Sequence, residues 1–90
     1  MSLLLVTYDL KTPGRDYTAL FNAIQSSSSV WWHYLNNTWL VKTTLDANTL
    51  GKHLLQFITT NDRLLVIAVS GIGQGWLPNE AWEWIRKNST

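Results

Sequence analysis

Residues 30–44, VWWHYLNNTWLVKTT, decide the fold of this chain. Two runs rich in aromatic and β-branched residues, 30–35 and 38–44, flank the pair Asn36-Asn37. Such runs favour β-strands, and asparagine tolerates the positive φ that a tight turn needs. The stretch therefore predicts a β-hairpin, around which the rest of the chain must be arranged.

A strand and a helix are predicted before the hairpin. The apolar run 3–8, LLLVTY, is typical of a buried strand, and Pro13-Gly14 is a turn signal behind it. From Asp16 onward, apolar residues recur every three or four positions until the serine run 26–29, which predicts a helix. Asp16 suits the start of that helix as an N-cap or a first-turn acid.

A second helix and a further strand are predicted after the hairpin. Asp46 is the expected N-cap of the helix, and Asn61-Asp62 marks a turn before a strand over 64–69. The apolar stripe of this helix consists of Leu50, Leu54, Phe57 and Ile58.

The C-terminal segment predicts one more helix. A flexible glycine-rich connection, residues 71–75, leads to Pro78, which opens a short helix over 79–87. The order predicts a single α+β domain over residues 1–90, a ferredoxin-like β-α-β-β-α-β sandwich with a short C-terminal helix. Two helices should cover one face of an antiparallel sheet.

Composition limits the classes of function. Only 14% of the residues are charged, against roughly 25% in an average globular protein, and the formal net charge is +1. This balance argues against an avid, sequence-indifferent polyanion binder, although RNA or DNA contacts remain open if the bases cluster. No apolar segment approaches the roughly 20 residues that span a bilayer, so no membrane contact is expected. The absence of cysteine fits a cytoplasmic protein.

Six tryptophans are too many for one small core, so a homodimer is expected. Aromatic side chains on an open sheet can stack on unpaired bases, or they can bury against a partner subunit. The predicted interface residues are Trp31, Trp32, Trp39, Trp76 and Trp82. A non-catalytic assembly module is therefore an alternative function, in which these surfaces bind a protein partner or a small ligand.

Four segments resemble a known group of small proteins. Residues 8–17 (YDLKTPGRDY), 31–35 (WWHYL), 61–67 (NDRLLVI) and 75–84 (GWLPNEAWEW) are similar to the SinR-like proteins of bacteria and phages. The Tyr-Asp pair that ends the first predicted strand also resembles the VapD-like superfamily of ferredoxin-like nucleases. That superfamily includes the smaller subunit of the CRISPR spacer-acquisition complex.

The resemblance implies a homodimer of a bacterial or phage-encoded protein. For the alternative function, the non-catalytic assembly module, phage defence or counter-defence is the expected setting. It also implies that Asp9 faces its two-fold mate and that the two carboxylates hold a divalent ion. Some members of the superfamily cleave RNA or DNA, and others bind nucleic acid without cutting it. On this basis we expect nucleic-acid binding with Mg²⁺-dependent phosphodiester cleavage, with Asp9 as metal ligand and catalytic residue and Tyr8 as its neighbour.

The residues themselves leave two interpretations of Asp9 open. Two Asp9 carboxylates from a symmetric dimer suit Mg²⁺, whose octahedron waters or phosphate oxygens would complete. Alternatively, Asp9 merely accepts backbone N–H bonds in the turn.

A phosphate-binding loop is the second candidate site. Lys11 and Arg15 supply two cations beside a helix start, and Thr12 and Tyr17 add hydroxyl groups. The alternative is that both bases are solvated and partly pair with Asp16.

His33 is a third candidate, because a histidine titrates near neutral pH and can act as a general acid or base. Strand alternation places Trp31, His33 and Leu35 on one face and Trp32 with Tyr34 on the other. A histidine that shares a face with apolar residues can equally be a hydrogen-bonded structural residue.

Overall fold

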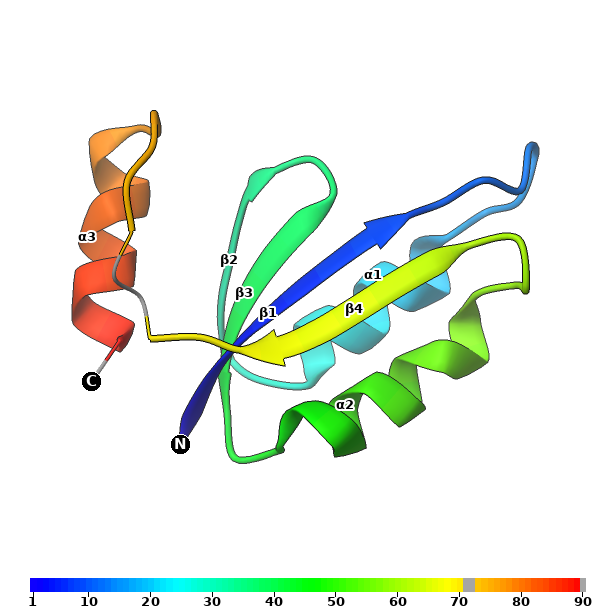
Figure 1. Cartoon of the computed structure of the whole chain (residues 1–90), viewed down its shortest axis with the longest axis horizontal. Helices are drawn as coiled ribbons and strands as arrows, with labels where there is room; N and C mark the ends of the chain where they lie inside the picture. Colours follow the sequence, from blue (N-terminus) through cyan, green and yellow to red (C-terminus); the bar gives the residue numbers. More distant parts are fainter. Residues whose placement is uncertain (71–72, 90) are drawn as a thin grey trace.

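The computed structural model describes residues 1–70 and 73–89, which form one four-stranded sheet and three α-helices (Figure 1). The strands are β1 (Ser2–Asp9), β2 (Val30–Leu35), β3 (Thr38–Thr43) and β4 (Arg63–Ala68). The helices are α1 (Thr18–Ser26), α2 (Ala47–Leu54) and α3 (Asn79–Asn88), and a short 3₁₀ turn over Leu55–Phe57 follows α2. None of the helices in the described ranges has the length and apolar composition needed to cross a membrane.

Neighbouring strands run antiparallel in the order β2-β3-β1-β4, so β1 and β3 are central and β2 and β4 are edges. The predicted hairpin at Asn36-Asn37 is confirmed as β2 and β3, although neither asparagine has the positive φ on which the prediction rested. Helices α1 and α2 lie on one side of the sheet, and α3 lies apart from them beside the hairpin (Figure 1). The predicted α+β class is confirmed, and the strand order is compatible with the expected ferredoxin-like arrangement.

Alternation along β1 divides the molecule into two cores. The even-numbered residues Leu4, Val6 and Tyr8 face α1 and α2 in the larger core. The helices contribute side chains with no exposed surface, namely Leu20, Ile24, Leu50 and Leu54. Each such burial contributes about 1.5–3 kcal/mol, so these four residues do most to hold the helices on the sheet.

The smaller core lies on the second face of the sheet, where α3 packs on Leu3, Trp32 and Leu40 through Ala81. The indole Nε1 of Trp32 donates to the carbonyl of Ala81 at 3.2 Å. The Lys42 ammonium donates to the carbonyl of Asn88 at 2.7 Å. Polar contacts of the sheet with both halves of α3 therefore fix the helix in place.

The rest of the second face is open to solvent. Helix α3 does not cover the half of this face that β1 and β4 form toward the end of β1. Leu65 and Ile67 are 51% and 47% exposed there, which is high for apolar strand residues. We call this surface the open face; it consists of the cross-strand pairs Thr7–Leu65 and Asp9–Arg63 and of Ile67, whose partner Leu5 is half-buried against the smaller core.

The two predicted helix starts differ in outcome. Asp46 is the N-cap of α2, as predicted, and its carboxylate accepts the Thr49 N–H at 2.7 Å. Helix α1 begins later than predicted, at Thr18, so Asp16 is neither its N-cap nor in its first turn. Asp16 instead accepts the Thr18 N–H at 2.9 Å from a position just before the helix.

Other boundaries shift by small amounts. Helix α2 ends at Leu54, and Phe57 and Ile58 of the predicted stripe lie beyond it while still packing on the larger core. Strand β4 begins and ends one residue earlier than predicted. Of the predicted glycine-rich connection, residues 71–72 lie outside the described part of the chain.

The expected alternation along β2 is correct for four of its residues and wrong for Leu35. Trp31 and His33 contact Trp39 on the side of α1, whereas Trp32 and Tyr34 contact each other on the side of α3. The pairing with β3 shifts between Trp32 and Leu35, so that Leu35 opposes Thr38. A one-residue shift of register turns a side chain to the other face.

The contact between Trp32 and Ala81 predicts how strongly α3 is held. Trp32→Phe keeps most of the buried ring and removes the N–H donor, so it should lower the free energy of unfolding by about 1 kcal/mol. Urea denaturation measures this loss, and hydrogen exchange should show faster exchange in α3.

Trp31→Phe is the matched control, because Trp31 is 40% exposed and lies on the other side of the sheet. It should change stability by less than about 0.5 kcal/mol. An equal loss in both variants would show that the Trp32 hydrogen bond does not hold α3.

Candidate functional site

Three exposed charged residues gather at one end of the open face. Asp9, the last residue of β1, lies directly across from Arg63, the first residue of β4. The Lys11 ammonium lies 3.3 Å from the Asp9 carboxylate, and the two side chains are 62% and 60% exposed. An ion pair this exposed adds little to stability, so both charges are available to a ligand.

A shallow hollow of about 280 Å³ adjoins these charges. Its lining residues are Thr7, Tyr8, Asp9, Arg63, Leu64 and Leu65. The hollow thus combines a carboxylate, a guanidinium, a hydroxyl and apolar carbon, and Lys11 stands beside it. Two cations around one acid suit an anionic ligand such as a phosphate, with or without a metal ion.

A single subunit provides too few ligands for a metal centre of its own. In residues 1–70 and 73–89, no group of three or more His, Cys, Asp or Glu side chains could hold a metal ion. Asp9 would therefore offer one carboxylate to a divalent cation. The other ligands would come from waters, from a bound phosphate or from a second copy of the chain.

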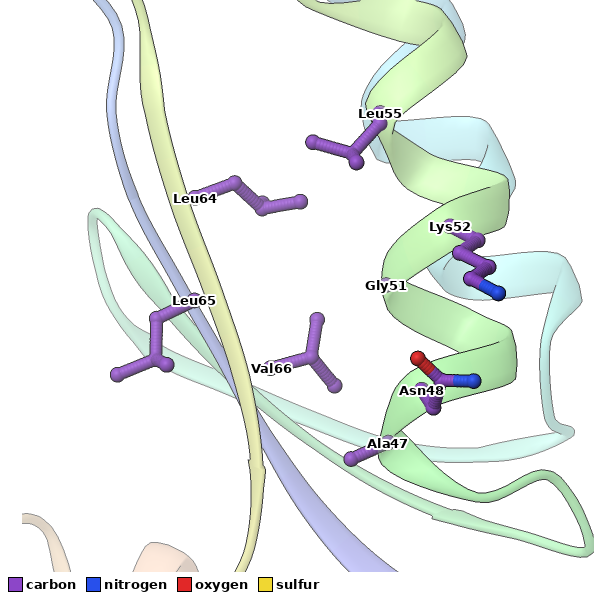
Figure 2. A pocket seen from close by; sticks show the side chains of 8 residues that line it. All are labelled: Ala47, Asn48, Gly51, Lys52, Leu55, Leu64, Leu65 and Val66. Carbon is purple, nitrogen blue, oxygen red and sulfur yellow. The ribbon is translucent and has the colours of Figure 1, made fainter.

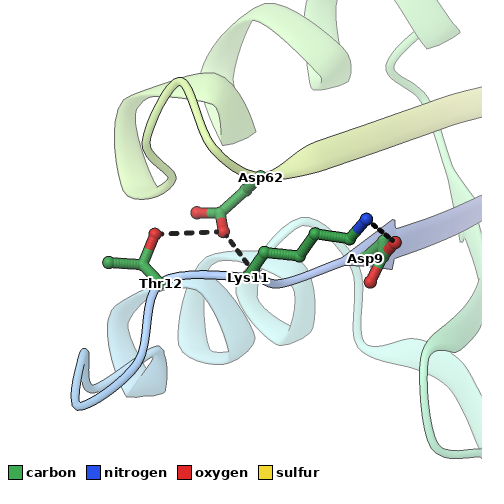
Figure 3. A network of polar contacts seen from close by, with 4 residues as sticks. All are labelled: Asp9, Lys11, Thr12 and Asp62. Atoms are coloured by element: carbon green, nitrogen blue, oxygen red, sulfur yellow. Dashed lines mark hydrogen bonds and ion pairs between the residues drawn. The ribbon is translucent and has the colours of Figure 1, made fainter.

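A second carboxylate, Asp62, is only 5% exposed and holds the loop after β1 (Figure 3). It accepts the backbone N–H groups of Lys11 at 2.7 Å and Thr59 at 2.9 Å. It also accepts the hydroxyls of Tyr17 at 2.8 Å and Thr12 at 3.3 Å. Four donors around one acid make this loop a fixed structure rather than a flexible connection.

Burial opposes the ionisation of Asp62, but its hydrogen bonds outweigh that effect. The N–H groups of Thr59 and Lys11 and the hydroxyl of Tyr17 lower the pKa of the carboxyl to about 2. Asp62 is therefore a carboxylate at neutral pH. Its charge is directed at the loop, and every neighbour of its oxygens is a donor.

Lys11 connects the two carboxylates. Its backbone N–H bonds Asp62, while its side chain turns back along β1 to Asp9 (Figure 3). The buried acid thereby fixes the backbone position from which the exposed ammonium reaches the end of the open face. Asp62 is thus a positioning residue for the exposed charges.

The structure separates the predicted phosphate-binding residues. Thr12 and Tyr17 direct their hydroxyls toward Asp62, and Lys11 points its ammonium at Asp9. The Arg15 guanidinium donates to the carbonyl of Phe57 at 3.4 Å and lies 5.7 Å from the centre of the Tyr17 ring. Only Lys11 of this set reaches the exposed site, where Arg63 is the second cation.

Tyr8 lies on the opposite side of the sheet from Asp9. It is 7% exposed; its hydroxyl accepts the Trp39 indole N–H at 3.0 Å and donates to the carbonyl of Asn36 at 3.3 Å. Burial raises the pKa of this hydroxyl, although the bond from Trp39 lowers it in part. Its ring packs 5.8 Å from that of Phe21 in the larger core.

His33 also lies away from Asp9. Its ring stacks on Trp39 with the centroids 3.7 Å apart and the planes at 10°. Its Nε2 lies 3.2 Å from the carbonyl of Asn36. These contacts place His33 beside the β2–β3 turn, on the side of α1, and the structure does not bring it together with Asp9.

The predicted interface tryptophans divide by exposure. Trp32 and Trp39 are 3% and 2% exposed, because they are buried in the smaller and the larger core of the chain itself. Trp31 is 40% exposed, Trp82 is half-buried, and Trp76 is 98% exposed on the segment before α3. Trp76 is therefore the tryptophan most available to a partner.

Sequence reasoning missed Asp62 and Arg63 as site residues. The sequence pattern predicts only a turn at Asp62 and assigns no role to Arg63. The donors to Asp62 lie up to 51 residues away along the chain, and Arg63 reaches Asp9 only through the pairing of β1 with β4. No local pattern reports either contact.

The lowered pKa of Asp62 predicts an acid-sensitive loop. Because this pKa is about 2 in the folded protein and roughly 3.9 in an unfolded chain, the charged form stabilises the fold above about pH 4. That contribution should be lost progressively as the pH falls through about 2. Urea unfolding at a series of pH values measures the loss.

Asp62→Asn is the comparison that isolates this group, because Asp16 and Asp46 also have lowered pKa values. The variant should have a lower free energy of unfolding at neutral pH. The difference in this free energy between the variant and the unmodified protein should become smaller between about pH 4 and pH 2. Hydrogen exchange at Lys11 should be faster in the variant. A difference in free energy of unfolding that stays constant with pH would contradict stabilisation of the fold by the Asp62 charge.

No protein-family model matches this chain, and neither does any curated protein sequence. What the protein does must therefore be inferred from the geometry of its own residues, and above all from the exposed charges around Asp9.

Proposed function

We propose that this protein binds nucleic acid as a homodimer and contacts the phosphate backbone at the end of its open face. One observation carries the proposal. Two exposed cations lie next to Asp9, in a chain that has only seven lysines and arginines: Lys11 forms an ion pair with it, and Arg63 is its partner across the two strands. Cations at one exposed site attract phosphate, which supplies the sequence-independent part of nucleic-acid affinity.

Asp9 gives this phosphate site a second property. A carboxylate beside a phosphate is repulsive unless a cation lies between them, and Mg²⁺ prefers oxygen ligands of both kinds. We propose that Mg²⁺ binds at Asp9 when nucleic acid is present, with waters, phosphate oxygens or a second Asp9 as further ligands. An ion held there would orient a water and offset charge on a phosphodiester, which is the chemistry of metal-dependent nucleases.

The neighbouring apolar surface suits the bases of a single strand. Leu65 follows Arg63 on the open face, and Tyr34 is 42% exposed beside Trp32 on the same side of the sheet. Unpaired bases stack on aromatic side chains and cover apolar surface, whereas paired bases expose mainly their edges. The proposed ligand is therefore single-stranded RNA or DNA.

The proposed family assignment rests on topology and one motif. The strand order β2-β3-β1-β4 with two helices on one face supports a ferredoxin-like fold. Asp9 stands at the end of β1, where the SinR-like and VapD-like resemblance expects its acid. Tyr8 and His33 have no part in the proposed site, because neither lies on the open face.

A protein-binding assembly module is the second candidate function. Trp76 is 98% exposed, and the open face carries the exposed residues Leu65 and Ile67. Large apolar side chains of this kind anchor protein interfaces. A protein that binds no oligonucleotide even at low salt would favour this candidate over nucleic-acid binding.

The cations beside Asp9 predict the salt dependence of binding. Lys11→Ala and Arg63→Ala should each weaken binding to a fluorescent single-stranded oligonucleotide at low salt. Each should lower the slope of log K against log salt by about 0.7, because one phosphate contact is lost. Fluorescence anisotropy measures both quantities.

Lys87→Ala is the matched control, because Lys87 is an exposed base in the last turn of α3. It should leave the affinity and the slope unchanged. A double variant of Lys11 and Arg63 that binds as tightly as the unmodified protein would contradict the proposed site.

The metal part of the proposal makes a separate prediction. Mg²⁺ should strengthen oligonucleotide binding by the unmodified protein, and EDTA should reverse this gain. Asp9→Asn removes the repulsive charge, so the variant should bind more tightly than the unmodified protein without metal and should not respond to Mg²⁺. Any Mg²⁺-dependent cleavage should disappear in Asp9→Asn and Asp9→Ala.

Glu83→Gln is the control for the loss of one exposed acid, and it should keep the response to Mg²⁺. Cleavage that survives both Asp9 substitutions would belong to another site or to a contaminant. A response to Mg²⁺ that is the same in Asp9→Asn would remove the metal from the proposed function.

A further inference from the structure

Strand β4 is an edge strand with the composition of an interior one. In the described part of the chain its sole neighbour is β1. Residues 64–67, LLVI, are apolar on both faces of the sheet, a pattern typical of strands flanked on both sides. Exposed edges normally carry charges, proline or a bulge that prevent pairing, yet β4 has only Arg63 at its start.

The free edge of β4 presents backbone groups at alternate residues. Val69 donates its N–H to Leu3, which shows that the odd-numbered residues of this strand bond toward β1. In an antiparallel ladder the bonding direction alternates, so the even-numbered residues point the other way. The N–H and C=O groups of Leu64, Val66 and Ala68 are therefore directed away from the sheet.

A groove runs along this edge on the side of the helices, between the side chains of β4 and helix α2 (Figure 2). It has a volume of about 470 Å³ and lies between β4 and α2. Leu64 and Val66 point into it from the strand, and Ala47 and Gly51 face it from the helix (Figure 2). These small residues keep α2 from filling the space next to the edge.

We infer that a second copy of this chain pairs with β4, antiparallel and with Val66 on the two-fold axis. Val66 then exchanges both backbone bonds with Val66 of the second copy, and Leu64 does so with Ala68. The same register sets Leu65 against Ile67 on the open face. All outward backbone groups of the strand are paired, and every facing side chain from 64 to 68 is apolar.

Neighbouring registers are worse for definite reasons. A shift that places Leu65 on the axis sets Arg63 against Ile67 and leaves Ala68 without a partner in the strand. A register that sets even-numbered residues of one copy against odd-numbered residues of the other opposes outward backbone groups with inward ones, so the ladder cannot form. The best match of β4 is therefore β4 itself, which favours a second copy over an unrelated peptide.

This edge dimer deepens the proposed homodimer and rests on that part of the proposed function. It makes one continuous sheet, with the open faces of both copies on the same side. Arg63 lies across from residue 69 of the second copy, so the two Asp9 residues are separated by roughly 20 Å along the strands. In this dimer a second Asp9 cannot be a ligand of the same ion, so each Asp9 holds its own phosphate or ion, and a nucleic-acid strand can contact both sites.

The interface is tested by one charge at the pair Leu65–Ile67. Sedimentation or light scattering should show the unmodified protein as a dimer at micromolar concentration and Ile67→Lys as a monomer. Leu35→Lys is the matched control on the other edge, since Leu35 and Ile67 are both 47% exposed. It should stay dimeric. Circular dichroism checks that both variants are folded.

Cross-linking gives a second measurement, because the chain has no cysteine. Under mild oxidation Val66→Cys should form a disulfide-linked dimer, since facing residues of such a pair have Cα atoms about 5.5 Å apart. Asp9→Cys should not. Cross-linking through Asp9→Cys instead would mean that the open faces meet, and it would overturn the edge dimer.

Three further results would also overturn the inference: an unmodified protein that is monomeric, an Ile67→Lys variant that stays dimeric, and dissociation by Leu35→Lys alone. Oligonucleotide binding by the same samples separates the two proposals. If the edge dimer forms but binds no oligonucleotide, only the proposal of nucleic-acid binding is rejected. If the protein binds the oligonucleotide but does not form the edge dimer, only the proposal of the edge dimer is rejected.

Discussion

The hydrogen bonds of Asp62 are the interactions on which the candidate site depends. They join the loop after β1 to the turn before β4, two segments that are far apart in the sequence. Because Lys11 donates its N–H to this carboxylate, the backbone is fixed between the buried acid and the exposed one. The same turn leads directly into Arg63. One buried charge therefore positions both cations that flank Asp9.

Features that arise from neighbouring residues could be predicted from the sequence. The β2–β3 hairpin depends on Asn36-Asn37 and its flanking runs, and the start of α2 depends on the short contact between Asp46 and Thr49. The end of β1 at Asp9 could also be predicted, because it follows from the length of one apolar run. In each case the controlling interaction spans only a few residues, so its pattern is visible locally.

Features that depend on distant contacts could not be predicted. Thr12 and Tyr17 have the composition of a phosphate-binding loop, but their hydroxyls are directed to Asp62, which lies at least 45 residues away. Trp31 and Trp32 are adjacent and chemically identical, yet one is 40% and the other 3% exposed, because α3 packs on only one side of the hairpin. Composition describes the available side chains, and the sheet order decides which of them solvent reaches.

The small number of charged residues in the chain matters most at strand β4. Few charges on a small protein permit an apolar strand at an exposed edge, where like-charge repulsion would otherwise keep copies apart. Arg63 marks the point where this strand changes character: it faces Asp9 at the charged end of the open face, and the apolar run begins at the next residue. In the proposed dimer, self-association and nucleic-acid binding use different parts of one strand. A charge within 64–68 acts on the first, and a change at Arg63 acts on the second, so the two functions can be altered independently.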